Sequence, residues 1–316
     1  MDKAFLRWQE LFEGLRMIDS LDSQALYKQA LPCFYKIRSS EPGDDSALIG
    51  ASRVGGLPDL PSSLSWPVDG DGRLLTFLAQ VNFKELEPGF APYLPRDGWL
   101  YFFIEELDMW NDIPHRVFYF DGPGDELQKS EYPDPVGGPV RIYRPYQMHF
   151  DTGFTLYGGL MDALLADHPE WLKGNGPAET VIDHFQRECT RIGGHPMSFQ
   201  SLSEQYAYLK LSGLDDLYRY GTDLYSLEGF IRRERLEEED PDLLLQLRTD
   251  AARQIEEYRR DFADHKQRMR SIRPIFVLGS ENDMLWGDAG FLQFFMHEAD
   301  LAKRDFSRTY CEVIST

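Results

Sequence analysis

Two loops of the sequence repeat one pattern, and this repetition constrains the fold more than any other feature. Arg53-Val54-Gly55-Gly56-Leu57-Pro58 and Arg191-Ile192-Gly193-Gly194-His195-Pro196 share an arginine, a β-branched residue, two glycines and a proline in register. Glycine pairs beside proline are typical of tight backbone turns. A phosphate-binding loop is the alternative, but neither copy is followed by a lysine or a clear helix start. We therefore expect two matching turns that join parts of a sheet.

A strand pattern repeats together with these loops. Gly98-Trp99-Leu100-Tyr101-Phe102-Phe103-Ile104 resembles Gly290-Phe291-Leu292-Gln293-Phe294-Phe295-Met296. Each is preceded by another strand, predicted over 74–83 in the first case and resumed at 275–278 in the second. The same elements in the same order predict an internal duplication.

The fold class follows from this order. We expect an α+β fold with a mostly antiparallel sheet built from two related halves, at about 46–156 and 186–316, with peripheral helices. Residues 1–45 form a separate helical segment in this prediction, because residues 1–40 have a helical character. Apolar residues run at helical spacing from Phe5 to Ile18, and Ser20 or Asp22 is suited to capping a second helix, which Pro32 interrupts. Further helices are predicted over 160–172 and 179–188. The rest of the chain, 46–316, is predicted as one domain.

The second half carries a charged helical insertion at about 203–270. Its apolar stripe extends from Leu244 to Met269 and predicts one long amphipathic helix, which begins after Asp240-Pro241.

Charge limits the classes of partner. The formal net charge is −20, so the surface repels the phosphate backbone of nucleic acids and attracts basic proteins. Solubility alone is an alternative explanation for this charge.

Location is predicted from three sequence features. No apolar run reaches the length of a membrane span, and the first residues lack the pattern of a signal peptide. The three cysteines, Cys33, Cys189 and Cys311, are odd in number and lack metal-ligand spacing, which favours reduced thiols in the cytoplasm. The sequence predicts neither a metal site nor a cofactor, and it leaves the oligomeric state open.

The sequence contains no nucleophile elbow, metalloprotease motif or nucleotide-binding loop, and we assign no catalytic residue. Asp288, between Gly287 and Ala289 in a turn, is the best single polar candidate for a binding site. The alternative role of Asp288 is to stabilise the turn by bonding to nearby backbone. Trp286 is either a core anchor or an exposed binding residue.

Four more residues are candidates for ligand binding. Gln80 lies in an apolar strand, where its amide must be satisfied by backbone or by a ligand. Arg53 and Arg191 occupy matching places and are suited to binding a carboxylate with two hydrogen bonds. Pairing with Asp59 or another acidic neighbour is the alternative. His195 is a residue that can titrate near neutral pH, or a packed or surface histidine.

Several short motifs fall outside these candidates or overlap them. They are Gly55-Gly56-Leu57-Pro58, Trp66-Pro67, Phe77 to Val81, Leu94-Pro95 through Phe103, Gly194-His195-Pro196 with Gln200, Trp286 to Gly290 with Phe294-Phe295, Asp300-Leu301 and Asp305-Phe306. Over residues 50–306 the chain resembles the YwqG-like family of bacterial proteins, whose function is unknown. The resemblance implies an α+β fold dominated by antiparallel sheet. Thr190 and the segment 276–279 depart from the family's usual histidine and glutamine, so no paired role for these side chains carries over to the second half.

Two functional hypotheses follow. Some relatives of this kind lie in toxin–immunity gene neighbourhoods, which implies a cytoplasmic, non-catalytic protein-binding module that inhibits a basic toxin or effector. The acidic charge and the missing catalytic motifs favour the same role, and a non-enzymatic function is therefore the leading expectation. The alternative is a small-ligand-binding protein or an uncharacterised hydrolase with a cleft between the two halves.

Overall fold

The computed structural model of the chain describes residues 3–14, 23–40, 49–106, 112–132, 140–157, 166–167, 190–197, 203–236 and 241–315. The chain folds into two compact units. The first, called here the sheet unit, consists of residues 1–199 and 273–316, and the second, the helical unit, of residues 200–272. The helices predicted over 160–172 and 179–188 lie outside the described residues, except for positions 166–167.

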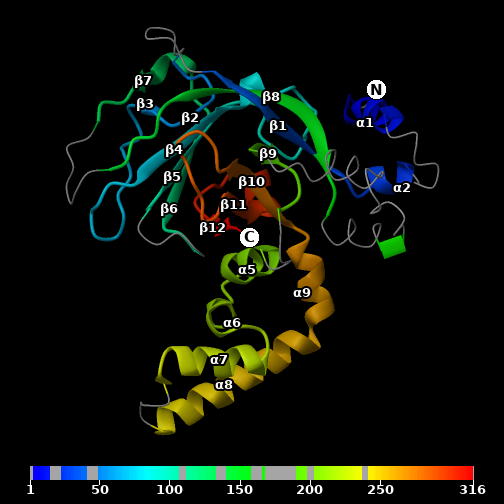
Figure 1. Ribbon diagram of the computed structural model, residues 1–316, viewed down its shortest axis with the longest axis vertical. Coiled ribbons are helices and arrows are strands. Elements are labelled where there is room, and N and C mark those ends of the chain that lie inside the picture. Colours follow the sequence, from blue (N-terminus) through cyan, green and yellow to red (C-terminus); the bar gives the residue numbers. More distant parts are fainter. Residues whose placement is uncertain are drawn as a thin grey trace. The chain divides into compact units, whose positions relative to one another are not determined.

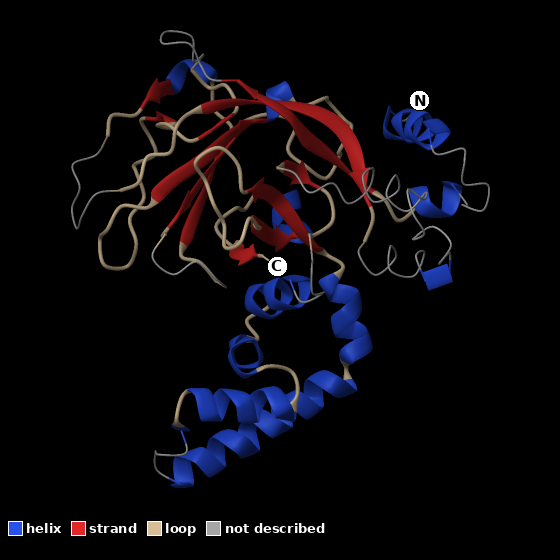
Figure 2. Ribbon diagram, in the orientation of Figure 1, coloured by secondary structure: helices blue, strands red, loops and turns tan. Residues whose placement is uncertain are grey.

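The sheet unit is built on one large, strongly curved sheet (Figures 1 and 2). Its strands in spatial order are β12 (Tyr310–Ile314), β11 (Phe291–His297), β10 (Ile272–Gly279), β9 (Arg191–Gly193), β1 (Leu31–Ser40), β8 (Tyr146–Thr155), β2 (Arg53–Val54), β4 (Thr76–Asn82), β5 (Trp99–Ile104) and β6 (His115–Phe120). Pairing is antiparallel between β1 and both of its neighbours, and along the series β8, β2, β4, β5 and β6. The α+β class and the mostly antiparallel sheet are therefore confirmed.

Smaller elements complete the sheet unit. They are the two-stranded sheet of β3 (Asp59–Pro61) and β7 (Leu127–Lys129), the helices α1 (Lys3–Gly14), α2 (Ser23–Tyr27) and α10 (Glu298–Ala302), and the 3-10 turns η1 (Phe83–Glu85) and η2 (Gly124–Glu126).

The core of the sheet unit lies inside the curve of the large sheet. All residues of β5 are buried, and Leu100, Phe102 and Ile104 face this core. The ring centroid of Phe102 lies 4.6 Å from that of Phe276 on β10 and 4.9 Å from that of Phe294 on β11. Strands near the opposite ends of the strand order thus pack against each other, and the sheet is nearly closed. On the outer face of β5 a second apolar cluster covers Trp99, Tyr101 and Phe103.

The prediction of helix over residues 31–40 is wrong. These residues form β1, which pairs with β8 over its whole length and with β9 through Cys33, Phe34 and Tyr35 (Figure 1). Aromatic residues suit a strand that is buried on both faces, and Pro32 lies near the strand start, where proline is tolerated. Pairing with β8 and β9 thus decides the conformation of this segment, which the sequence analysis places in the N-terminal helical segment.

The strand order is the same when read outwards in either direction from the central pair β1 and β8. One side continues through β9, β10, β11 and β12, and the other through β2, β4, β5 and β6. The two loop arginines lie at matching places in this order: Arg53 on β2 is paired with Gln80 on β4, and Arg191 on β9 with Val277 on β10.

The helical unit contains helices α5 (Ser203–Leu211), α6 (Asp215–Tyr220), α7 (Leu224–Arg233), α8 (Pro241–Arg260) and α9 (Phe262–Met269). The single long helix predicted over the stripe from Leu244 to Met269 is broken at Asp261. Ala251, Ile255 and Tyr258 of the stripe are buried, whereas Phe262 after the break is 45% exposed. Among the described helices, none combines the length and the apolar character that a bilayer span requires.

Candidate functional site

The first arginine loop forms a closed, buried polar cluster. The Nη2 of Arg53 lies 2.7 Å from the Oδ1 of Asp59, and both side chains are almost completely buried. The same Nη2 donates to the carbonyl of Leu57 at 2.6 Å. The other carboxylate oxygen of Asp59 accepts the backbone N–H of Gly50 at 2.7 Å and the Nε2 of Gln80 at 2.9 Å. Arg53 therefore has its counter-ion within its own loop.

Both ends of the Gln80 amide form hydrogen bonds to backbone and side-chain groups of the same cluster. Its Oε1 accepts the N–H of Asp59 at 2.8 Å, and its Nε2 also donates to the carbonyl of Ala51 at 2.9 Å. The hydroxyl of Tyr101 donates to the carbonyl of Asp59 at 2.8 Å. Since buried amides need such partners, this arrangement accounts for Gln80 without a ligand.

The glycine pair explains how the first loop reaches this geometry. Gly55 and Gly56 have φ of 68° and 72°, a region that favours glycine. A Cβ on Gly55 would lie 2.3 Å from the carbonyl oxygen of Arg144. The prediction of two tight turns is confirmed, because Gly193 and Gly194 have φ of 74° and 90°.

The second arginine loop repeats the backbone arrangement with different side chains. The Nη2 of Arg191 donates to the carbonyl of His195 at 2.6 Å, four residues on, as Arg53 does to Leu57. Gln293 on β11 accepts the N–H of Met197 with Oε1 at 2.9 Å and donates to its carbonyl with Nε2 at 2.8 Å. Met197 thus occupies the place that Asp59 has in the first loop, six residues after the arginine.

Among the described residues, Arg191 consequently lacks the counter-ion that Arg53 has. The residue is 2% exposed, and its Nε is buried with no hydrogen-bond partner. Across the part of the chain that the structure describes, no carboxylate forms an ion pair with its guanidinium, and its single hydrogen bond goes to a neutral carbonyl. A buried charge without a partner is unfavourable, which makes Arg191 the most unusual of the predicted site residues.

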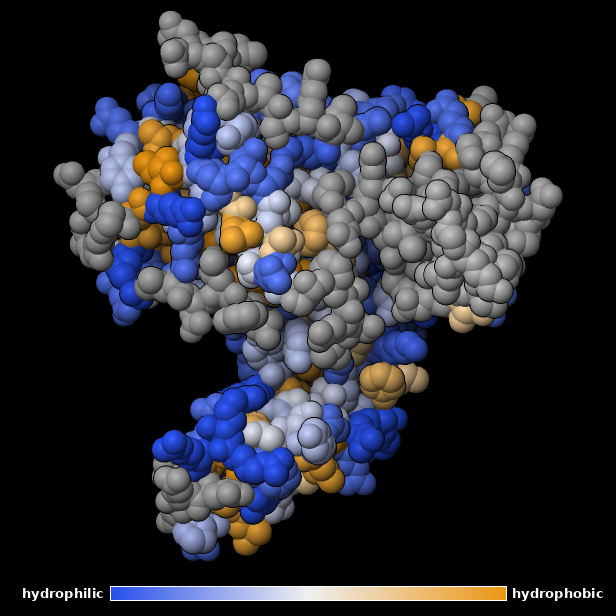
Figure 3. Space-filling view, in the orientation of Figure 1, coloured by the Kyte–Doolittle hydropathy of each residue, from blue (hydrophilic) through white to orange (hydrophobic). Residues whose placement is uncertain are grey.

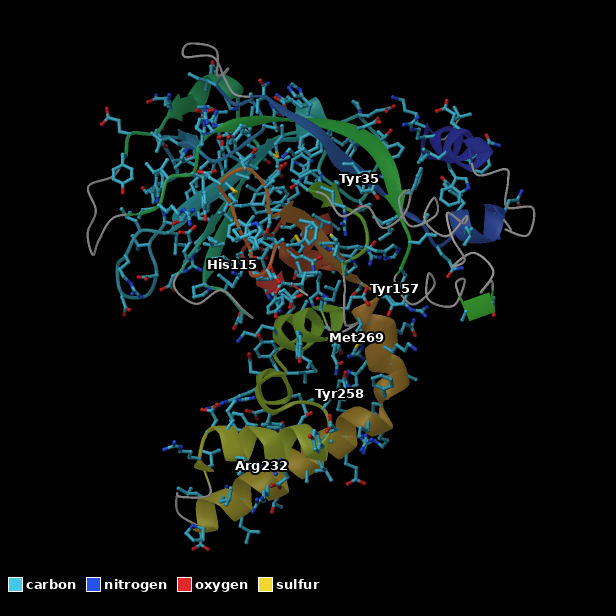
Figure 4. The ribbon with its side chains drawn as sticks, viewed as in Figure 1. Tyr35, His115, Tyr157, Arg232, Tyr258 and Met269 are labelled. Carbon is cyan, nitrogen blue, oxygen red and sulfur yellow. The ribbon has the colours of Figure 1, made fainter. Side chains whose placement is uncertain are left out.

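His195 lies next to this charge and is held in its neutral form. Burial, opposed in part by the hydrogen bond to Gln29 and reinforced by the charges of Arg273 and Arg191, lowers the pKa of His195 to about 4. Its Nε2 lies 3.0 Å from the carbonyl of Gln29, which can only accept, so Nε2 carries the proton. The ring also contacts that of Tyr157, a residue just beyond the end of β8 that is labelled in Figure 4. Near neutral pH, His195 is uncharged and therefore does not add to the positive charge of Arg191.

Acidification is expected to destabilise the sheet unit through His195. The unfolded state binds a proton at this residue below about pH 6.5, whereas the folded state resists protonation until about pH 4. Stability is therefore lost as the pH falls through this window, by roughly 1–2 kcal/mol for this group. Urea denaturation of wild type and of a His195→Gln variant at pH 7 and pH 4.5 measures it. The wild type should lose more stability than the variant, and an equal loss in both would contradict the assignment.

Trp286 and Asp288 do not join either arginine cluster. Trp286 is completely buried within the main core, so it is a core anchor and not an exposed binding residue. Asp288 is exposed, and no hydrogen bond of its carboxylate is found within the described part of the chain. The turn itself is closed by the N–H of Gly290, which donates to the carbonyl of Trp286 at 2.7 Å. Positive φ falls on Gly287 and Ala289.

The helical unit has a cavity of its own, which the sequence does not reveal. Its volume is about 560 Å³, and it lies along α6, the end of α8 and the start of α9. The residues that line it are Gly213, Leu214, Asp215, Asp216, Leu217, Gln254, Glu257, Tyr258, Arg260, Asp261 and His265. Four carboxylates thus oppose one guanidinium. Figure 4 places Tyr258 on α8 close to α9, and its ring stacks on that of His265 with centroids 4.4 Å apart.

Metal binding finds no support in the described segments, where histidine, cysteine and acidic side chains do not gather in groups of three or more that could hold an ion. Cys33 and Cys311 are buried cysteines that are not joined in a disulfide, and Cys189 lies outside the described residues.

Most of the chain matches a family model. The model is described as a domain of unknown function (DUF1963) and covers residues 52–313, a range that contains both arginine loops, the strands from β2 to β11, most of β12 and the helical unit. No curated protein matches the chain. Because the matched range is well over half of the sequence, the protein belongs to the DUF1963 family of domains of unknown function.

Proposed function

We propose that the protein is a non-catalytic binding module for a basic protein, and that the acidic cavity of the helical unit receives a basic side chain of that partner. The observation that carries the proposal is the cavity lining, in which Asp215, Asp216, Glu257 and Asp261 surround a space of about 560 Å³. A lysine or arginine side chain has the length to enter such a space, with its apolar stem against Tyr258 and its charge among the carboxylates.

The electrostatics of the cavity favour a cation. Asp216 accepts a hydrogen bond from Gln254, a neutral group, whereas Asp215 and Asp261 are paired with Lys210 and Arg260. Burial, together with the charge of Arg268, lowers the pKa of His265, so this residue adds no positive charge near pH 7. The carboxylates of Asp216 and Glu257 therefore remain available to an incoming cation.

Long-range charge supports the same class of partner. A net charge of −20 accelerates the encounter with a basic protein and repels nucleic acid. The visible surface of the helical unit is largely hydrophilic, with a few apolar side chains (Figure 3). Leu243 and Leu245 of α8 are 62% and 64% exposed. Such residues provide apolar contact area around a charged centre.

The biological role in this proposal is inhibition of a basic toxin or effector in the cytoplasm, as an immunity protein does. The resemblance of the motifs to the YwqG-like family and its toxin–immunity neighbourhoods supports this role, and we propose that the chain is a member of that group. The buried cysteines Cys33 and Cys311, which are not joined in a disulfide, are in keeping with a reducing compartment.

The test is a binding measurement with charge variants of the cavity. A double variant Asp216→Asn/Glu257→Gln is expected to bind the basic protein encoded beside its gene about tenfold more weakly than wild type, because each lost charge pair is worth about 0.7 kcal/mol. Isothermal titration at two salt concentrations measures the affinity and its salt dependence.

The control for each single substitution is Glu256→Gln, which removes one negative charge from the exposed position next to Glu257 and outside the cavity. It should leave the affinity nearly unchanged. Absence of binding to the neighbouring gene product at low salt, or equal binding by the double variant and wild type, would refute the proposal.

We also propose that the two halves of the sheet unit arose by duplication. The strand order on either side of β1 and β8, and the matching bonds of Arg53 and Arg191, support it. Separate profiles of the two halves across the family provide the test. If the Arg-Gly-Gly loops do not align in that comparison, the duplication is rejected.

A further inference from the structure

The two arginine loops share their backbone hydrogen bonds, but among the described residues only the first has a counter-ion for its arginine. Arg53 and Arg191 each donate to a carbonyl four residues later in the chain. In each loop the Oε1 of a glutamine also accepts the N–H of the residue six positions after the arginine. In the first loop this residue is Asp59, whose Oδ1 lies 2.7 Å from the Nη2 of Arg53 and neutralises its charge. In the second it is Met197, and the charge of Arg191 is left uncompensated among the described residues.

The described residues around Arg191 supply a second guanidinium and two neutral side chains. The guanidinium of Arg273 is close enough to act on both His195 and Tyr93, as that of Arg191 does. His195 is neutral, and the hydroxyl of Tyr93 donates to the carbonyl of Pro32 at 2.6 Å while it accepts the N–H of Gly194 at 2.7 Å. Burial raises the pKa of Tyr93, so this phenol stays neutral as well. The guanidinium of Arg273 is itself paired with Glu298 at 3.0 Å.

We propose that Arg191 binds the carboxylate of a small organic anion, which takes the position beside Arg191 that Asp59 has beside Arg53. The unpartnered Nε supplies one of the N–H donors on the edge of the guanidinium, and a carboxylate matches this planar edge. The side chain of Met197, 9% exposed and conformationally adaptable, moves to admit the ligand. This site belongs to the sheet unit and the acidic cavity to the helical unit, so either can exist without the other.

A carboxylate fits the second loop better than a phosphate does. The first loop already holds a carboxylate in the matching geometry, with one arginine, one backbone N–H and one amide as donors. A phosphate needs more donors, and the N–H groups of Gly194, His195 and Met197 are already bonded to Tyr93, Thr155 and Gln293.

Thermal unfolding with acetate as the probe tests the proposal. Acetate is expected to raise the unfolding midpoint of the wild type above that in sodium chloride of equal ionic strength, and phosphate is expected to have a smaller effect. In Arg191→Met the acetate shift should be lost, because the guanidinium is absent. Arg304→Met, which removes an exposed arginine from the same unit, should keep the full shift.

A second variant supplies the carboxylate from within the chain. Met197→Asp places an aspartate where the first loop has Asp59, and it should raise the midpoint without acetate by at least about 2 °C and abolish the acetate shift. If this variant does not fold, the methyl resonance of Met197 in isotope-labelled wild type serves instead, since acetate should shift it in wild type and not in Arg191→Met.

Three outcomes would overturn the proposal. They are an equal effect of acetate and sodium chloride on the wild type, an acetate shift that persists in Arg191→Met, and an acetate shift that disappears equally in Arg304→Met. A phosphate shift larger than the acetate shift would exclude a carboxylate as the ligand class.

Discussion

Replacing Arg53 with methionine is expected to lower the free energy of unfolding of the sheet unit by about 3–5 kcal/mol, the usual cost of breaking a buried ion pair. The variant leaves the carboxylate of Asp59, whose side chain is 2% exposed, without its cation. The remaining donors, the N–H of Gly50 and the amide of Gln80, do not neutralise its charge. Urea denaturation followed by tryptophan fluorescence measures the loss. All tryptophans of the chain lie in the sheet unit, so the signal reports this unit alone.

The matched control is Arg191→Met, which removes the same side chain from the matching place of the other half. Because Arg191 has no carboxylate partner among the described residues, this change should cost less than about 1 kcal/mol. In the double variant Arg53→Met/Asp59→Asn, the uncompensated charge is gone and most of the stability should return. Equal losses for Arg53→Met and Arg191→Met would show that ion pairing is not what distinguishes the two loops.

The local conformation of the two arginine loops was predictable from sequence. Two glycines followed by a proline specify a turn through their own backbone preferences, and no distant residue is needed to infer it. The positive φ of Gly55, Gly56, Gly193 and Gly194 follows directly. The pairing of Arg53 with Asp59 was foreseen as an alternative, because both residues lie in the same loop.

The partners that come from other strands were not predictable in the same way. Gln80 acts from β4 in the first half, whereas the amide that serves the second loop, Gln293, comes from β11. When the strand pattern that begins at Gly98 is aligned with the one that begins at Gly290, Gln293 matches Tyr101. Both side chains donate to the carbonyl of the residue six positions after the arginine of their half. The backbone N–H is thus held by a glutamine from β4 in the first loop and from β11 in the second, whereas the carbonyl is held by Tyr101 in the first loop and by Gln293 in the second. A comparison of the two sequences registers this only as a missing glutamine.

The acidic cavity and strand β1 show a second limit of sequence reasoning. The cavity joins residues 213–217 with residues 254–265, which approach each other because α6 packs beside α8. The residues of β1 lie in the segment that the sequence analysis predicts as helical, and they form a strand because β8 and β9 pair with them. In both cases the decisive interactions are long-range, and the sequence offers the signal for them only after the topology is known.

Replacing Gly290 with alanine is expected to be the most damaging small change in the second half, with a loss of about 3 kcal/mol or more. A Cβ at this position would lie 1.9 Å from the carbonyl oxygen of Ile314 on β12, closer than any real contact. The backbone of Gly290 cannot retreat, because its N–H is bonded to Trp286 and its carbonyl to the N–H and the hydroxyl of Ser280. Strand β12 must therefore move away, and the pairing of Phe291 with Ile314 is lost first.

The control for Gly290→Ala is Gly70→Ala in the turn after β3, where the added Cβ meets no atom within 4 Å and φ is not positive. This variant should stay within about 0.5 kcal/mol of wild type. Hydrogen exchange of the Phe291 and Val313 amides separates the proposed cause from a general loss of stability, since the amides of β12 should exchange faster than those of β4 in Gly290→Ala. If both variants lose the same stability, or if β12 remains as protected as β4, the close approach of Gly290 to β12 does not explain why a glycine stands at the start of this strand.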